Sequence, residues 1–161
     1  RQGYPSVILG GALRFGALPS ALQESDHIAE APVIMVTSNA GEHLTLEVLR
    51  QVYLAFGQDS SKEIWIKIHP HLELRTEVYE FVFDGEVPAH FHFVDEPIAA
   101  LLSRVDLLIY SSTSVCFEAL ARGIPVISLV PETFIDLDDL RFFPHLLCAI
   151  SSPETLRNKV S

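Results

Sequence analysis

Short apolar runs alternate with longer amphipathic stretches along most of this chain. Runs of four to eight apolar, often β-branched residues predict strands, whereas apolar residues three or four positions apart over a longer stretch predict helices. The predicted strands are 33–39, 63–71, 90–95, 107–112, 125–130 and 146–151. The predicted helices are 42–57, 73–83, 97–105, 113–123 and the terminal 153–161, with Pro97 expected at the first position of the third helix.

This alternation predicts an α/β domain over residues 33–161. Strands separated by helices of about ten to fifteen residues indicate βαβ units and a parallel sheet. The strands are apolar almost throughout, and right-handed crossovers then give a Rossmann-like, doubly wound parallel sheet with helices on both faces. Residues 1–32 are rich in Gly and Pro and lack a clear period, so we expect a linker or arm from a missing N-terminal domain.

Composition and charge narrow the range of partners. The 161 residues are 48% hydrophobic and 20% charged, which is typical of one folded domain. The 11 basic and 21 acidic residues give a formal net charge of -10, and a field of that sign repels nucleic acids and anionic lipid surfaces. A small anionic ligand held by local donors stays compatible with this charge.

Cysteine usage and the lengths of apolar runs indicate a cytoplasmic protein. Cys116 and Cys148 lie in apolar runs without CxxC spacing, so we expect free, buried thiols in a reducing compartment. No run approaches the ~18 apolar residues of a membrane span, and no signal peptide opens the sequence. No Met begins the chain, and the pattern of 153–161 is still helical where the sequence ends, so we expect this to be a piece of a longer protein. Any peripheral contact with a membrane would then be made by the full-length protein.

Four consecutive hydroxyl residues stand where a predicted strand meets a predicted helix. Ligands of an open parallel sheet bind beyond the carboxyl ends of its strands. Helix N-termini offer free N–H groups and a partial positive charge, and hydroxyls add donors without bulk, so such a turn can hold phosphate. Ordinary N-capping needs only one hydroxyl. The phosphate-binding candidates are therefore Ser111, Ser112, Thr113 and Ser114.

Glu118 is an acid on an otherwise apolar predicted helix. It lies four residues after Ser114, so the two side chains can share one helix face. A carboxylate there can accept two hydrogen bonds from a ribose diol. The alternative is an i,i+4 pair with Arg122, which contributes only ~0.3–0.5 kcal/mol at a surface.

Polar residues also follow the first and second predicted strands. In "KIHPH" (67–71), Pro70 ends the strand, and His69 can donate to a phosphate or accept a proton near pH 7, which makes it the catalytic candidate. A structural histidine is the alternative for His69, and it is favoured for His71, His90 and His92. A metal site is not expected, because no Cys or acid near these four has supporting spacing. The secondary phosphate candidates are His71 and the first turn, Thr37, Ser38, Asn39 and Gly41, which lacks the GxGxxG and GxxxxGK[ST] patterns.

Together these motifs resemble the donor-binding, C-terminal half of GT-B glycosyltransferases. "SSTSVCFEALARGIPVISL" (111–129) is similar to the small-residue turn and "EALAxGxPVI" helix that cradle a sugar nucleotide there. "KIHPH" and "SSTS" resemble the HP and Ser/Thr motifs of bacterial surface-carbohydrate enzymes, including sialyltransferases and polyol-phosphate transferases. The resemblance covers roughly residues 30 to 161.

The resemblance implies roles for the candidate residues. His69 and the turn 111–113 would contact the nucleotide phosphates, and Glu118 the ribose. The acceptor site and the usual catalytic base would lie on the missing N-terminal domain, so this fragment is expected to be inactive alone, without a cofactor or bound metal. Many retaining members carry a second acid eight positions before the ribose glutamate, where this chain has Tyr110, which argues against retaining chemistry of that type.

The expected function is therefore sugar-nucleotide donor binding in a bacterial polysaccharide glycosyltransferase. One alternative is a sugar-nucleotide epimerase of the same fold, which would need an acid/base set that Asp95, Glu96 and Glu132 do not convincingly form. Another is a non-catalytic α/β nucleotide-binding or regulatory module. A receiver-like module would need acids at the end of the first strand, where residues 37–39 are Thr, Ser and Asn.

Overall fold

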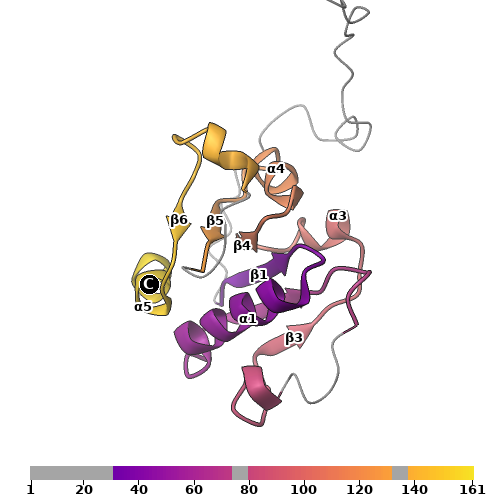
Figure 1. Ribbon diagram of the computed structural model, residues 1–161, viewed down its shortest axis with the longest axis vertical. Coiled ribbons are helices and arrows are strands. Elements are labelled where there is room, and N and C mark those ends of the chain that lie inside the picture. Colours follow the sequence, from indigo (N-terminus) through magenta and orange to yellow (C-terminus); the bar gives the residue numbers. More distant parts are fainter. Residues whose placement is uncertain (1–30, 74–79, 132–137) are drawn as a thin grey trace, which may run out of the picture.

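The computed structural model describes residues 31–73, 80–131 and 138–161, which form one α/β layer structure (Figure 1). All strand pairs are parallel, and their order across the sheet is β3-β2-β1-β4-β5-β6. This arrangement confirms the predicted doubly wound parallel sheet. The strands are β1 Val33–Ser38, β2 Glu63–Lys67, β3 Phe91–Phe93, β4 Leu107–Ser111, β5 Val126–Leu129 and β6 Ala149–Ile150.

Helices cover both faces of this sheet. The helices that lie wholly within the described residues are α1 Glu42–Phe56, α3 Ile98–Leu101, α4 Val115–Leu120, the 3-10 helix η2 Asp139–Phe142 and α5 Pro153–Val160. Helices α1 and α5 pack on one face, where Val36 and Ile66 point, and α3, α4 and η2 pack on the other, where Met35 and Leu108 point. Alternate residues of each strand therefore enter two separate cores, which explains why the strands read as continuous apolar runs.

Two predicted segments lie largely outside the described residues, and other elements differ from the sequence prediction. The helix expected over 73–83 falls mostly on 74–79, outside the described residues, and its described end, 80–82, is helical. The arm expected over 1–32 falls on 1–30, also outside them. Pro97 is the residue before α3 rather than its first residue, and α3 is shorter than expected. Helix η2 is an element that the apolar pattern does not predict.

The C-terminal end of α4 is set by a backbone motif at Gly123, the last residue of the predicted helix 113–123. Gly123 adopts a positive φ of 76°, which glycine tolerates without strain. Its N–H donates to Leu120 O at 3.0 Å, and the N–H of Ile124 donates to Ala119 O at 3.0 Å. These two bonds form a Schellman ending, after which Pro125 cannot continue a helix.

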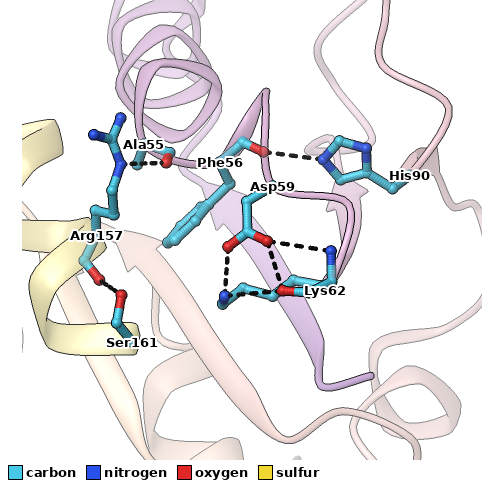
Figure 2. A network of polar contacts seen from close by, with 8 residues as sticks. Ala55, Phe56, Asp59, Lys62, His90, Arg157 and Ser161 are labelled. Atoms are coloured by element: carbon cyan, nitrogen blue, oxygen red, sulfur yellow. Dashed lines mark hydrogen bonds and ion pairs between the residues drawn. The ribbon is translucent and has the colours of Figure 1, made fainter. Parts of the chain in front are cut away.

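The end of α1 is held by side chains from two distant segments (Figure 2). Arg157 of α5 donates from Nε to Ala55 O at 2.9 Å and from Nη2 to Leu54 O at 2.6 Å. His90 Nε2 lies 3.0 Å from Phe56 O and must be the donor, because a carbonyl only accepts. The last carbonyls of α1 are thus satisfied, and His90 has the structural role expected for it.

The four histidines that were considered for a metal site lie toward opposite ends of the strands. His92 Nε2 contacts Glu63 Oε2 at 2.6 Å near the start of β2, and His90 precedes β3. His69 and His71 follow the other end of β2. Among the residues that the structure describes, no group of three or more His, Cys, Asp or Glu side chains could hold a metal ion.

Candidate functional site at the carboxyl edge of the sheet

The carboxyl ends of β1 and β4 lie side by side, and the winding of the sheet reverses between them. Ser38, the last residue of β1, is paired in register with Ser111, the last residue of β4. Thr37 is paired with Lys67 on one side and with Tyr110 on the other. In open α/β sheets this switch point is where ligands bind. The first-turn, HP and hydroxyl-turn candidates thus follow three adjacent strands.

Several polar groups of the first turn, residues 37–41, make hydrogen bonds that stabilise the turn itself. Ser38 Oγ lies 2.6 Å from Thr45 Oγ1, which donates to Gly41 O at 2.9 Å. The N–H of Gly41 donates to Asn39 Oδ1 at 2.7 Å. A Cβ at position 41 would stand 2.9 Å from that same oxygen, so a larger residue here would have to displace the Asn39 side chain. Among the first-turn candidates, Ser38 and Asn39 therefore have a local structural role whatever else they contact.

The hydroxyl turn, residues 111–114, is strained and keeps most of its hydroxyls unpaired. Ser112 has a φ of 47°, a left-handed conformation that costs a non-glycine residue about 1–2 kcal/mol. Ser114 is the N-cap of α4 but makes no side-chain cap bond, and Thr113 Oγ1 lies 3.5 Å from the N–H of Val115. With the rest of the described chain, the hydroxyls of Ser111, Ser112 and Ser114 make no hydrogen bond. Capping therefore does not account for them.

Backbone outliers of this kind cluster at ligand sites. Helix α4 has only six residues, so its dipole is weaker than the sequence prediction of a longer helix implies. Phosphate binding at this turn would rest mainly on hydroxyl and backbone N–H donors.

The Glu118 carboxylate is available, because the alternative pairing does not form. Arg122 Nη1 donates at 3.2 Å to the backbone carbonyl of Glu118 and not to its carboxylate. The side chain is partly buried, and it makes no hydrogen bond or ion pair with any other described residue. A partly buried carboxylate without a partner is costly unless a ligand supplies donors.

His69 is held so that one ring nitrogen faces a partner in the protein. The N–H of His71 donates to His69 Nδ1 at 3.2 Å, and the N–H of Leu72 donates to His69 O at 2.9 Å. Because Nδ1 accepts, the neutral ring carries its proton on Nε2. The two imidazole rings lie edge to face, with centroids 5.2 Å apart. His69 thus has an Nε2–H donor for a ligand.

Asp138 is a buried polar residue that the sequence reasoning missed. Tyr110 donates its hydroxyl to Asp138 Oδ2 at 2.5 Å, Ser128 Oγ donates to the same oxygen, and the N–H of Leu140 donates to Oδ1 at 2.8 Å. Asp138 is only 2% exposed. Burial first, and then the hydrogen bond to this carboxylate, raises the pKa of Tyr110 well above its usual value.

Part of this cluster has a local sequence signal. Asp138 is the N-cap of η2 and accepts a hydrogen bond from the N–H of Leu140, and Asp is one of the favoured N-cap residues. Its pairing with Tyr110 spans 28 residues and needs the fold. Tyr110 is thus a buried hydrogen-bond donor.

The described residues do not enclose a nucleotide-sized pocket. A narrow gap between α1 and the ends of β1 and β2 is lined by nine residues, among them Thr37, Ser38, Thr45 and Lys67, and it has no room for a ligand. A nucleotide site at this end of the sheet would need further walls.

Comparison with known proteins identifies the fold. The chain matches no protein-family model and no curated protein. The solved glycosyltransferase VinC, in complex with dTDP, matches at 16% identity with a TM-score of 0.56, covering 88% of this chain and 36% of VinC. The C-terminal domain of the group 1 glycosyl transferase LpcC from Francisella tularensis matches at 14% identity with a TM-score of 0.53, covering 80% of this chain and 73% of that domain. The fold is that of a GT-B glycosyltransferase domain.

An epimerase shares this GT-B fold as well. A protein from Listeria monocytogenes assigned as a UDP-N-acetylglucosamine 2-epimerase matches at 17% identity with a TM-score of 0.56, covering 86% of this chain and 39% of that protein. The chain spans little more than a third of the length of VinC and of the epimerase. The predicted GT-B resemblance is confirmed at the level of the fold. Within the described ranges, no helix is long and apolar enough to cross a membrane.

Proposed function

We propose that this domain binds the nucleotide-sugar donor of a glycosyltransferase for bacterial surface polysaccharide, in the cytoplasm. The observation that carries the proposal is the register pairing of Ser38 with Ser111. It brings the hydroxyl turn, with its unpaired hydroxyls, to the switch point of a GT-B-type sheet. That VinC was solved with dTDP supports a nucleotide ligand for this fold.

Each candidate has a distinct role in this proposal. The hydroxyl turn donates to the phosphates, and the unpaired Glu118 carboxylate accepts two hydrogen bonds from the ribose diol. The Nε2–H of His69 stabilises the charge that develops on the leaving phosphate, which is the electrostatic work that preorganised donors perform in active sites. In this scheme no bound metal is needed for that step.

Transfer itself is proposed to need a second domain. The chain covers 36% of VinC, and the hollow among the described residues has no room for a nucleotide. We place acceptor binding and the catalytic base on that domain. This domain alone should then bind donor without transferring sugar.

The acids at the carboxyl ends of the strands give little support to the epimerase alternative. Asp95 and Glu96 follow β3, and Glu96 is engaged in an ion pair with Arg104. That pair lowers the pKa of Glu96, the wrong direction for a proton donor near pH 7. Glu132 lies outside the described residues. A non-catalytic nucleotide-binding module stays compatible with the fold and with a Glu118 that has no partner among the described residues, and sugar transfer by the whole protein would distinguish the two.

Thermal unfolding with a panel of nucleotides tests the proposal. At a hundredfold excess over Kd, a ligand of the folded state should stabilise the domain by ~2.7 kcal/mol, or about 5–10 °C for a chain of this size. The panel is CMP, CDP, UMP, UDP, GDP, ADP and dTDP at millimolar concentration. A domain that none of them stabilises contradicts the proposal, and sugar transfer by this chain alone contradicts the need for a second domain.

A further inference from the structure

The carboxylate of Asp138 holds together the ends of two neighbouring strands. Tyr110 of β4 is paired in register with Ser128 of β5, and this is the last pair between the two strands at their carboxyl ends. Tyr110 donates its hydroxyl to Asp138 Oδ2 at 2.5 Å, and Ser128 Oγ donates to the same oxygen. The N–H of Leu140 donates to Oδ1 at 2.8 Å, which fixes the carboxylate at the start of η2. One side chain thus connects both members of the pair to a third element.

This cluster is buried and rigid. Asp138 is 2% exposed, and Tyr110 and Ser128 are fully buried. Taking a carboxylate out of water is costly unless hydrogen-bond donors surround it, and a buried polar network whose members are satisfied holds them in one geometry. Such a network is expected beside a segment whose geometry matters.

The hydroxyl turn is that segment, because it begins directly after Tyr110. Ser111 follows Tyr110 in the chain, and Cys116 of α4, which is fully buried in the same core as Tyr110, follows the turn. Between these two buried residues Ser112 keeps its left-handed φ of 47°. A strained backbone persists only when the surrounding structure imposes it. Tyr110 and Cys116 flank the turn and are placed to impose this conformation.

We propose that Asp138 is a positioning residue of the nucleotide site, which acts through Tyr110 to hold the hydroxyl turn in the conformation that binds phosphate. The inference rests on the proposed function and adds to it a residue that does not touch the ligand. Asp138 is buried and repels anions, so it affects a bound phosphate only by placing Tyr110 and the turn that follows it. Without this hold, Ser112 should relax toward the negative φ that serine prefers.

The test compares nucleotide affinity in variants that break the cluster and in a variant that only loses stability. Asp138→Ala removes the acceptor, and Tyr110→Phe removes only the hydroxyl that reaches it. Calorimetric titration with UDP and CDP, at a temperature where each variant is folded by circular dichroism, should show binding at least about 10-fold weaker in both, because misplaced binding groups lose most of their effect. Val82→Ala opens a cavity in the core on the other face of the sheet, where Val82 is fully buried, and it should lower stability but keep affinity within about 2-fold.

Two further measurements separate positioning from stability. Asp138→Asn keeps an acceptor for the N–H of Leu140 and offers its NH2 to the two hydroxyls, which can also accept, so it should bind within about 3-fold of the parent. In ligand-free Asp138→Ala, the NMR amide signals of Ser112 and Ser114 should shift, although position 138 is distant in the sequence. In Val82→Ala these signals should stay in place.

Cluster variants that lose stability but bind nucleotide as the parent does would overturn the positioning role and leave nucleotide binding intact. Should Asp138→Ala fail to fold, Tyr110→Phe alone decides this point. A parent that binds no nucleotide contradicts the proposed function instead. In that case, unchanged amide signals of Ser112 and Ser114 in the ligand-free cluster variants would separately overturn the claim that Asp138 positions the turn.

Discussion

Ser112 holds a backbone conformation that glycine adopts more easily than serine. This residue, with its φ of 47°, lies in the hydroxyl turn beside Ser111 and Ser114, whose hydroxyls make no hydrogen bond with other described residues. Strain that persists in a fold is compensated elsewhere, and at ligand sites it often belongs to the function. We interpret the serine as kept for its hydroxyl, at some cost in stability.

Replacing Ser112 separates its two contributions. Ser112→Gly and Ser112→Ala both remove the hydroxyl, but only glycine relieves the positive φ. The glycine variant should be more stable than the alanine variant by about 1 kcal/mol in urea unfolding. Both should bind nucleoside phosphate about 10- to 100-fold more weakly by calorimetry. Parental affinity in Ser112→Gly would show that the hydroxyl does not contact the ligand.

Glu118 allows a similar separation of binding from stability. Glu118→Gln keeps the size of the side chain but removes the charge that would accept two ribose hydroxyls. We expect nucleotide binding to weaken by ~1.5–3 kcal/mol while the free energy of unfolding stays unchanged or rises, because a partly buried acid is costly in an empty site. The 2′-deoxynucleotide should bind the parent weakly and lose little more in the variant. Lower stability with unchanged binding would make Glu118 a structural acid.

Asp59, in the turn between α1 and β2 (Figure 2), gives a prediction for the pH dependence of stability. Hydrogen bonds first from Lys62 and then from Ser61 lower its pKa to about 2. Because the folded pKa lies below the unfolded value of about 3.9, the stabilisation is present above pH 4 and is lost as the pH falls toward 2. The carboxylate is 37% exposed, so solvent screening limits the effect to less than about 1 kcal/mol.

The measurement is urea unfolding of Asp59→Asn and the parent at pH 7, 4 and 3. The difference in unfolding free energy should shrink with each step. A difference that stays constant over this range would mean that the charge of Asp59 does not contribute.

Among elements, η2 depends most on a buried polar cluster. The Asp138 carboxylate joins the start of η2 to β4 through Tyr110 and to β5 through Ser128. Tyr110→Phe keeps the ring but leaves Asp138 with one donor fewer, so the unfolding free energy should fall by about 1–3 kcal/mol. Tyr53→Phe is the matched control, because its hydroxyl makes no hydrogen bond with described residues, and it should change stability by about 0.5 kcal/mol or less. Equal effects of the two changes would contradict the cluster's role.

The sequence pattern predicts the long elements better than the short ones. Helix α1 repeats its apolar positions over four turns, and the strands are continuous apolar runs, so tertiary contacts reinforce what the pattern indicates. Helix α4 ends early through a backbone motif at Gly123, and η2 depends on the Asp138 cluster. The ends of such short helices are set by a few backbone and capping hydrogen bonds, and the spacing of apolar residues does not predict these bonds.

At the scale of the whole molecule, the sequence predicts which edge carries the site but not how its residues pair. The rule for parallel sheets places the hydroxyl turn, His69 and the first turn together without knowledge of strand order. That Lys67, Thr37, Tyr110 and Ser128 stand in one row across the sheet follows only from the order β2-β1-β4-β5 and its register, which the sequence does not reveal.

Amide chemical-shift mapping by NMR tests the central claim most directly, because it reports where a nucleotide binds as well as whether it binds. Titration with UDP or CDP should shift the amides of the hydroxyl turn, of His69 and His71, and of Gly41, all at the carboxyl edge. Amides at the opposite edge, such as those of His90 and Asp59, should stay in place and serve as an internal control. Shifts concentrated at that opposite edge, or no shifts at millimolar nucleotide, would contradict a nucleotide site at the switch point of the sheet.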